Sequence, residues 1–292
     1  MDILVIQILN SFFYASVLFM IASGLSLIFG VMGIINLAHG SLYALGAYVT
    51  AWTVTAVAGG LPLILVLLLL PVGAVAVAAV GFAMEPTLIR PFYKRPEEYQ
   101  LLVTFGLLLV FEDVMRFLFG GAPLTAGAVM DKMGSIPVFE LFYPTYNFLV
   151  IAIGALAALG LWAFVYRTKF GVLLRATSQD MRMASALGLN ISRVYIQAFG
   201  LGCFMAGLGG AIVVPSQAAV LGMGIDNLVL AFVVVVIGGL GSLRGALIGA
   251  LIVSFVRTFM VQFFPELELA VLYLIAAGVL LVRPTGLFGK PT

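Results

Sequence analysis

The 82 residues between Asp2 and Glu85 contain no aspartate, glutamate, lysine or arginine. An ordinary soluble domain is about 25% charged, so a charge-free stretch of this length cannot supply a soluble surface. A helix needs about 20 apolar residues to cross a bilayer, which leaves room here for three crossings joined by short turns. In the whole chain of 292 residues, 63% are hydrophobic and 9% are charged. The sequence therefore predicts an all-α polytopic membrane protein and excludes a soluble globule.

Nine apolar segments follow one another along the chain, and all are predicted to be helical because lipid offers backbone groups no other partner. They run over 4–30, 34–58, 62–84, 101–119, 146–166, 194–214, 227–240, 246–263 and 269–282. The segment 227–240 is short and ends in a glycine-rich turn, so it is compatible with either a crossing or a re-entrant helix. Eight and nine membrane passes both fit the sequence. The connections are short, which predicts a single transmembrane domain over 1–292.

The positions of lysine and arginine predict the orientation, because cytoplasmic loops carry the excess of positive charge. Basic residues gather in 85–100, in 167–193 and in the tail, at Arg283 and Lys290. The connections 120–145 and 264–268 are mainly acidic and should face outward. With nine passes the N-terminus lies outside and the C-terminus in the cytoplasm; with eight, the first part of this assignment is reversed.

Enzyme, metal and nucleic-acid signatures are absent from the sequence. Fourteen basic and twelve acidic residues leave a net charge of +2, and the longest basic cluster is Lys94-Arg95, so no nucleic-acid partner is expected. His39 is the sole histidine and Cys203 the sole cysteine, which excludes a two-histidine metal site and an intrachain disulfide. The stretch 284–291 ends in Gly-Lys-Pro and lacks the residues of a phosphate loop. The chain is predicted to have no cofactor and no catalytic activity of its own.

Polar residues interrupt the apolar run between positions 30 and 43. An interruption at membrane depth is tolerated where it is buried in protein or lines a cavity. The candidates for a solute pathway are therefore Asn36, His39, Ser41 and Tyr43. The alternative is a tight turn at the cytoplasmic face made by Gly33 and Asn36, with His39 at the membrane interface.

Charged residues inside predicted spans occur near the outer side. Glu112, Asp113 and Arg116 lie in the fourth span and Arg257 in the eighth. Because charges in lipid are costly and usually pair inside a bundle, we hypothesise an ion pair between Glu112 or Asp113 and Arg257. The alternative is that these side chains extend to the interface individually.

The inner connection 167–193 encodes a short helix from about Thr177 to Leu187. Thr177 and Asp180 form a capping-box-like start, and Gly188 is a plausible stop. Met181, Ala184 and Leu187 share one side of this helix, whereas Arg182 lies elsewhere. Such an amphipathic helix can lie on lipid or dock into a groove of a partner, and the spacing alone favours lipid.

Small residues recur every four positions in two segments, as Ala198, Gly202, Ala206 and Gly210 and as Gly241, Gly245 and Gly249. Such ladders let helix backbones approach closely in lipid. They predict tight helix packing, and they are also compatible with helices that slide during transport.

Four motif blocks together resemble the permeases of ATP-binding-cassette importers of the high-affinity branched-chain amino acid type. Block 1 is 29–40 with Tyr43 and Gly46, block 2 is 171–175 with 183–190 and Arg193, block 3 is 238–249, and block 4 is 284–289. They occur in the family's order and spacing over the whole chain. The chain is similar to the shorter of the two permease types of that family.

The resemblance implies an assembly in a bacterial inner membrane. Its partners would be a second related permease, two cytoplasmic ATP-binding subunits that hydrolyse ATP, and an external substrate-binding protein. The short helix becomes a coupling helix that docks on an ATPase, which replaces the lipid-surface interpretation. Its candidate residues are Arg175, Thr177, Asp180, Met181, Arg182, Ala184, Leu187 and Gly188.

The implied activity is alternating-access import of a small neutral or zwitterionic solute, with branched-chain amino acids preferred, although relatives in the same family carry urea, amides or other amino acids. A stand-alone, ion-coupled secondary transporter is the competing class, and it would need a carboxylate at mid-membrane.

Overall fold

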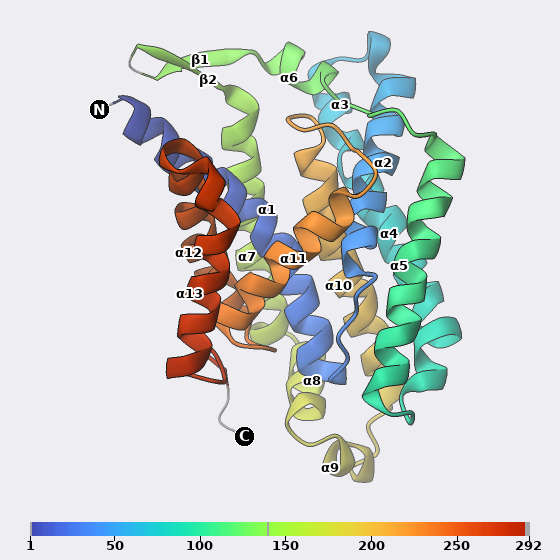
Figure 1. Cartoon of the computed structure of the whole chain (residues 1–292). Coiled ribbons are helices and arrows are strands. Elements are labelled where there is room, and N and C mark those ends of the chain that lie inside the picture. Colours follow the sequence, from blue (N-terminus) through green and yellow to red (C-terminus); the bar gives the residue numbers. More distant parts are fainter. Residues whose placement is uncertain (1, 139, 290–292) are drawn as a thin grey trace.

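The computed structural model describes residues 2–138 and 140–289, and helices dominate this part of the chain (Figure 1). The α-helices are α1 (Asp2–Met32), α2 (His39–Val57), α3 (Leu63–Leu69), α4 (Pro71–Met84), α5 (Glu97–Phe119), α6 (Ala128–Met133), α7 (Thr145–Arg167), α8 (Lys169–Gln179), α9 (Met181–Ala186), α10 (Ile191–Val213), α11 (Met223–Gly238), α12 (Leu243–Phe263) and α13 (Glu268–Val282). Short 3-10 or π turns are η1 (Ala58–Gly60), η2 (Glu85–Ile89), η3 (Arg90–Phe92) and η4 (Pro265–Leu267). The strands β1 (Ser135–Val138) and β2 (Leu141–Pro144) form one antiparallel hairpin.

Each predicted apolar segment coincides with a helix or with a pair of consecutive helices. Seven helical stretches in the described residues are long and apolar enough to cross a membrane, namely α1, α2 with η1, α3 through η3, α7, α10, α12, and η4 with α13. Helix α5 has 23 residues but carries three charged residues near its outer end. Helix α11 has 16 residues and runs obliquely, and α10 and α12 join it at opposite ends (Figure 1). With α5 and α11 added to the seven stretches, the described helices give nine candidate passes.

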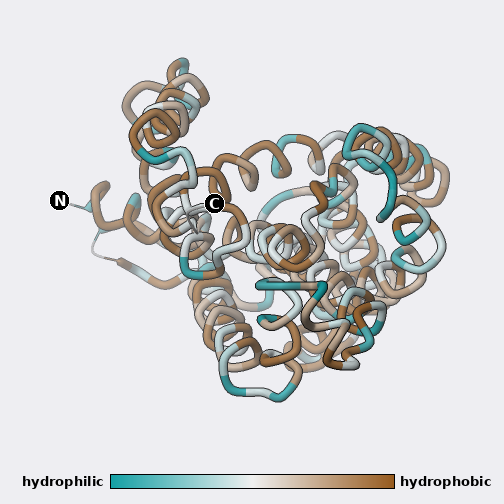
Figure 2. The backbone as a smooth tube through the Cα atoms, turned by 90° about the horizontal axis from the view of Figure 1, so that it is seen from below, coloured by the Kyte–Doolittle hydropathy of each residue, from teal (hydrophilic) through white to brown (hydrophobic). Residues whose placement is uncertain are grey.

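The two ends of the bundle differ in their charges as the sequence predicts. Helices α8 and α9, the α4–α5 connection and the C-terminal segment lie at the lower end of Figure 1, whereas the N-terminus and the β1–β2 hairpin lie at the upper end. The lower end carries the arginine-rich connections and is the cytoplasmic end by the positive-inside rule. Lys290 lies outside the described residues. Seen from the lower end, hydrophilic residues gather in the connections and the helices are mostly hydrophobic (Figure 2).

Helices α1 and α10 form the centre of the bundle, and glycines allow their backbones to touch. A Cβ atom added to Gly202 of α10 would lie 2.7 Å from the Ile28 side chain of α1, and one added to Gly210 would overlap the carbonyl oxygen of Tyr43 in α2. Ala206 is fully buried on the same helix. Because side chains larger than hydrogen would separate these backbones, the small residues set the helix spacing.

The second ladder differs from its prediction at one end. Gly245 and Gly249 lie on α12 and meet α11, where Gly238 and Val234 approach them. Gly241 precedes α12 and has a φ of +77°, so it belongs to the α11–α12 turn, where its Cα packs against Gly30. Helix α12 therefore begins at Leu243, two residues after the first glycine of the ladder. The preceding turn contains Gly239 and Gly241, which both have a positive φ that glycine adopts readily.

The chain leaves α1 at Gly33, whose φ is +68°, but α2 does not begin there. After Gly33 it rises in an extended conformation along α1, and α2 begins near half height (Figure 1). His39 Nε2 hydrogen-bonds the carbonyl oxygen of Ile21 at 3.0 Å, and Ile21 lies about 16 Å from the inner end of α1. His39 is fully buried, so the alternative with an interfacial histidine does not describe this segment.

Candidate functional site

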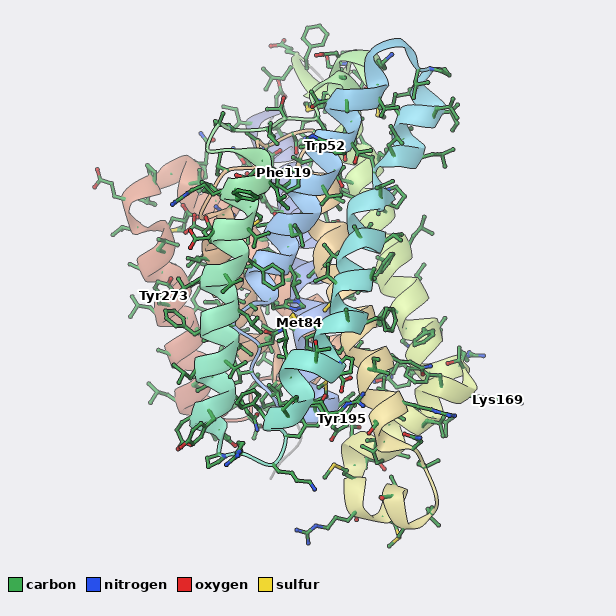
Figure 3. All side chains as sticks on the ribbon, turned by 90° about the vertical axis from the view of Figure 1, so that its right-hand side faces the viewer. Trp52, Met84, Phe119, Lys169, Tyr195 and Tyr273 are labelled. Carbon is green, nitrogen blue, oxygen red and sulfur yellow. The ribbon has the colours of Figure 1, made fainter. Side chains whose placement is uncertain are left out.

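Three features carry the candidate function: a projecting segment at the inner end, a cavity at the inner end, and a smaller cavity near the outer end. The projecting segment consists of α8 and α9, and α9 extends below the rest of the bundle (Figures 1 and 3).

The predicted single helix from Thr177 to Leu187 is wrong, because the chain breaks at Asp180. Thr177 is buried in the last turn of α8, and Asp180 has an extended conformation. The Asp180 carboxylate accepts a hydrogen bond from the backbone N–H of Met183 at 2.9 Å and caps α9. Asp180 thus starts a new helix rather than serving as the third residue of a capping box. Gly188 has a φ of +84° and ends α9 after one further residue.

Apolar side chains on and beside α9 are exposed, although Ala184 is buried against the bundle. Met183 is 58% exposed and Leu187 is 76% exposed, and Arg182 is also exposed. Met181 is exposed but its sulfur accepts a hydrogen bond from the Tyr195 hydroxyl at 3.0 Å. Arg175 lies in α8, where its guanidinium donates to the carbonyl oxygen of Val165 at the end of α7. The segment therefore presents a small apolar surface on a helix that is anchored to α10 and α7.

The inner cavity has a volume of about 780 Å³ and brings together residues from all four motif blocks. Gly30 comes from block 1, Arg175 from block 2, Arg244 from block 3 and Thr285 from block 4. The guanidiniums of Arg175 and Arg244 both lie near the ring of Tyr166, at 5.2 and 5.8 Å from its centroid. The C-terminal block closes this region, since Leu287 and Phe288 donate backbone hydrogen bonds to Ile237 and Gly238 at the end of α11.

The outer cavity has a volume of about 220 Å³ and lies between α1, α2, α11, α12 and the α10–α11 connection. Its polar lining residues are Tyr14, Tyr43, Gln217, Asp226, Asn227 and Arg257, and its apolar lining includes Val17, Leu18, Val213, Met223 and Leu230. A cavity this small is below the roughly 300–1,000 Å³ of drug-sized ligand pockets. It can hold only a small solute.

Of the four predicted pathway residues, one lines a cavity and three are buried among helices. Tyr43 lines the outer cavity. Asn36, His39 and Ser41 line neither cavity and are buried among helices. The Asn36 side chain accepts from the Ala38 N–H at 3.1 Å, and the Ser41 hydroxyl donates to the Leu108 carbonyl oxygen at 3.3 Å. Of the four, Tyr43 is the one that lines either of these two cavities.

The hypothesised ion pair between Glu112 or Asp113 and Arg257 is wrong. Arg257 Nε donates to Glu268 at 2.6 Å, because α13 folds back against α12 and places its first residue there. The Glu112 carboxylate instead accepts from the backbone N–H of Gly222 at 2.6 Å, and Asp113 lies 3.8 Å from Arg116. The sequence spacing favoured a pair across the bundle because Glu268 had been assigned to a loop.

Glu85 is the residue that sequence reasoning missed. The sequence predicts Glu85 in the inner connection 85–100, but it is 0% exposed in the π turn that follows α4. Its carboxylate pairs with Arg90 at 2.7 Å and accepts a hydrogen bond from the Tyr93 hydroxyl. Burial, together with the bond to Glu85, raises the pKa of the Tyr93 phenol well above its usual range. The Tyr93 ring packs edge-on against Tyr195, with ring centroids 5.2 Å apart, so this cluster connects the end of α4 to the residue that binds Met181.

Pro86 follows Glu85 and lies inside this π turn. Pro86 removes a backbone donor within the helix, and a π turn accommodates this while keeping the chain helical to Ile89. No group of three or more metal-ligating side chains occurs within residues 2–138 and 140–289.

Comparison with known proteins identifies the family. A family model described as the permease component of branched-chain amino acid transport systems matches residues 7–280. The chain belongs to this permease family. It is 28% identical to the high-affinity branched-chain amino acid transport system permease protein LivH of Salmonella typhimurium, over 98% of this chain and 95% of LivH. BraD of Pseudomonas aeruginosa, a permease protein of the same description, is 26% identical over the same shares.

Another permease protein, LivM, matches over a smaller share of its own length. LivM of Escherichia coli K12 is 25% identical over 90% of this chain and 66% of LivM. The permease therefore matches LivH over a larger share of the relative's length than it matches LivM, and with a higher sequence identity. It is a multi-pass permease of the inner membrane, and its family role is that of a transport subunit.

Proposed function

We propose that this permease moves branched-chain amino acids into the cytoplasm as one subunit of an ATP-driven importer. The observation that carries the proposal is the family match over 7–280, which includes the outer cavity, the projecting segment and the lining of the inner cavity up to Leu280. The complete importer would contain a second related permease, two ATP-binding subunits on the cytoplasmic side and an external substrate-binding protein. ATP hydrolysis belongs to the partner subunits.

The segment α8–α9 is the proposed coupling site. A helix of six residues gains little stability alone, yet α9 is held in place by the Asp180 cap and by the Tyr195 bond to Met181. Its exposed Met183 and Leu187 fit an apolar groove on an ATPase, in the helix-in-groove manner of recognition. Movement of the ATPase pair would pass through α9 to Tyr195 on α10 and to the buried Glu85 cluster.

Co-purification of the tagged permease from its native membrane tests this assembly. The wild type should bring down an ATP-binding subunit and take up leucine in proteoliposomes supplied with ATP and the binding protein. Leu187→Asp should release the ATPase, since a charge in an apolar groove is costly. The matched control is Phe142→Asp, which places the same charge at a 74% exposed residue at the outer end.

A stand-alone, ion-coupled transporter is the alternative outcome of the same experiment. Leucine uptake driven by an ion gradient, without an ATPase in the preparation, would contradict the importer assignment. Among the described residues Glu85 is a buried carboxylate near the inner end, but its pairing with Arg90 leaves it without the freedom to bind and release an ion.

A further inference from the structure

The outer cavity combines one cationic group, one free anionic group and an apolar wall in a small space. Arg257 contributes the cation and Asp226 the anion, while Val17, Leu18 and Leu230 contribute aliphatic surface. We propose that this cavity is a binding site within the permease for a zwitterionic amino acid with an aliphatic side chain. The inference rests on the proposed import function and names the residues that would hold the solute in transit.

Arg257 retains donors for a carboxylate. Its Nε donates to Glu268, and this is the one hydrogen bond that its side chain makes within the described residues. The guanidinium lies 5.1 Å from the centroid of the Tyr14 ring, which fixes its plane beside the cavity. Because a guanidinium has five N–H donors, its remaining donors can bind a carboxylate in a bidentate manner.

Tyr43 supplies a second donor on the same cavity. Its side chain is 1% exposed and lines the cavity. A tyrosine hydroxyl that borders a cavity can donate a hydrogen bond to a polar ligand bound there. The α-carboxylate of an amino acid provides an acceptor for it.

Asp226 provides the complement for the ammonium group. It lies in the first turn of α11, it is exposed toward the outer side, and no ion pair neutralises it within residues 2–138 and 140–289. Asn227 and Gln217 are already engaged, with the Met223 carbonyl oxygen at 2.9 Å and with the Tyr14 hydroxyl at 3.2 Å. The arrangement therefore matches a solute that carries both charges, and it disfavours a solute with only one.

Photolabelling of the purified permease–ATPase complex tests this site. The probe is photo-leucine, a diazirine analogue of leucine that keeps its amino and carboxyl groups, applied without the external binding protein. Labelling is expected on peptides that contain Leu18 or Leu230, and excess leucine should suppress it. Leucinamide and 4-methylpentanoate each lack one charge and should compete about ten-fold more weakly or worse, as expected for one lost charge-assisted hydrogen bond.

The variants separate binding from folding. Arg257→Gln and Asp226→Asn should each reduce the labelling about ten-fold or more. Tyr43→Phe removes only a hydroxyl and should reduce it several-fold, so the test stands even if Arg257→Gln fails to fold. Glu266→Gln changes an exposed acid of η4 that does not line the cavity and should leave the labelling unchanged.

Two results overturn the proposal, and they differ from failure of the proposed function. Labelling that persists in both Tyr43→Phe and Asp226→Asn, or labelling of other peptides that leucine suppresses, rejects this cavity while leucine uptake remains. A wild-type importer that takes up no leucine rejects the import function itself.

Discussion

The two cavities of this permease are built in different ways. The inner cavity is lined by runs of neighbouring residues, such as Leu240 to Arg244 and Pro284 to Thr285, in which glycine backbones pack closely. The outer cavity is lined by single side chains from several helices, with Tyr43, Asp226 and Arg257 each from a different one. The inner region should therefore be sensitive to added volume and the outer region to lost polar groups. In the outer cavity, substitutions that keep the size of a side chain but remove one polar atom should therefore lower transport while the protein still assembles.

The largest effect is expected from added volume at the inner end. A side chain on Gly238 of α11 would overlap the Gly245 carbonyl oxygen of α12, and helix backbones cannot separate without moving the C-terminal block that caps α11. Gly238→Leu should abolish the monodisperse peak in size-exclusion chromatography of a fluorescent fusion, since overpacking costs about 1–3 kcal/mol even where a core can relax.

Gly278→Leu is the matched control for that substitution. Gly278 lies on α13 with nothing within 4 Å of an added Cβ, so its peak should remain at the wild-type height. Equal losses in the two variants would mean that the membrane insertion of glycine-rich helices, and not the contact between α11 and α12, limits assembly.

The next effect comes from the buried carboxylate that links α4 to the projecting segment. Glu85→Gln removes the ion pair with Arg90 while keeping the size of the side chain. Because Arg90 is 38% exposed and can turn to water, the expected loss is about 1–3 kcal/mol rather than the larger cost of stranding a buried charge. A fall in the melting temperature of the purified protein would measure it, and the exposed Glu98→Gln should change that temperature little.

The burial of Glu85 and its pairing with Arg90 could not be predicted from the sequence. The nine apolar segments, the orientation and the stop at Gly188 follow from local patterns, and the helices occupy the predicted places. Long-range pairing does not follow from such patterns. Arg257 could be assigned a wrong partner because several acids lie at the same depth, and only the fold of α13 selects Glu268.

In the candidate site, too, single residues and motifs could be predicted from the sequence, whereas their contacts in space could not. The motif blocks could be recognised in sequence because their residues are contiguous, yet their meeting in one cavity depends on four separated elements. In the outer cavity Tyr43 was predicted as a pathway residue, whereas Asp226 was not, because an acid at the start of a helix is common and carries no signal alone.

A smaller effect is expected from the cap that divides α8 from α9. Asp180→Ala removes the acceptor for the Met183 N–H and should destabilise α9 locally by about 1 kcal/mol. Hydrogen exchange of the α9 amides should then be about five-fold faster, which is the rate ratio for that energy. Asn190→Ala removes the equivalent cap from α10, and it should leave the exchange of α9 unchanged because α10 is held by its packing in the bundle. Unchanged exchange in Asp180→Ala would show that the Tyr195 bond to Met181 is sufficient to hold α9.

The smallest effect tests how the inner cavity positions its two arginines. Tyr166→Leu keeps an apolar side chain but removes the ring that Arg175 and Arg244 share, and an exposed cation–π contact is worth about 0.5–1 kcal/mol. If the shared ring positions both arginines, Arg244→Gln should lower the melting temperature less in the Tyr166→Leu background than in the wild type. Additive losses in this double-mutant cycle would mean that Arg244 and Tyr166 act independently. The inner cavity would then, like the outer one, be a set of single side chains held apart by helix packing.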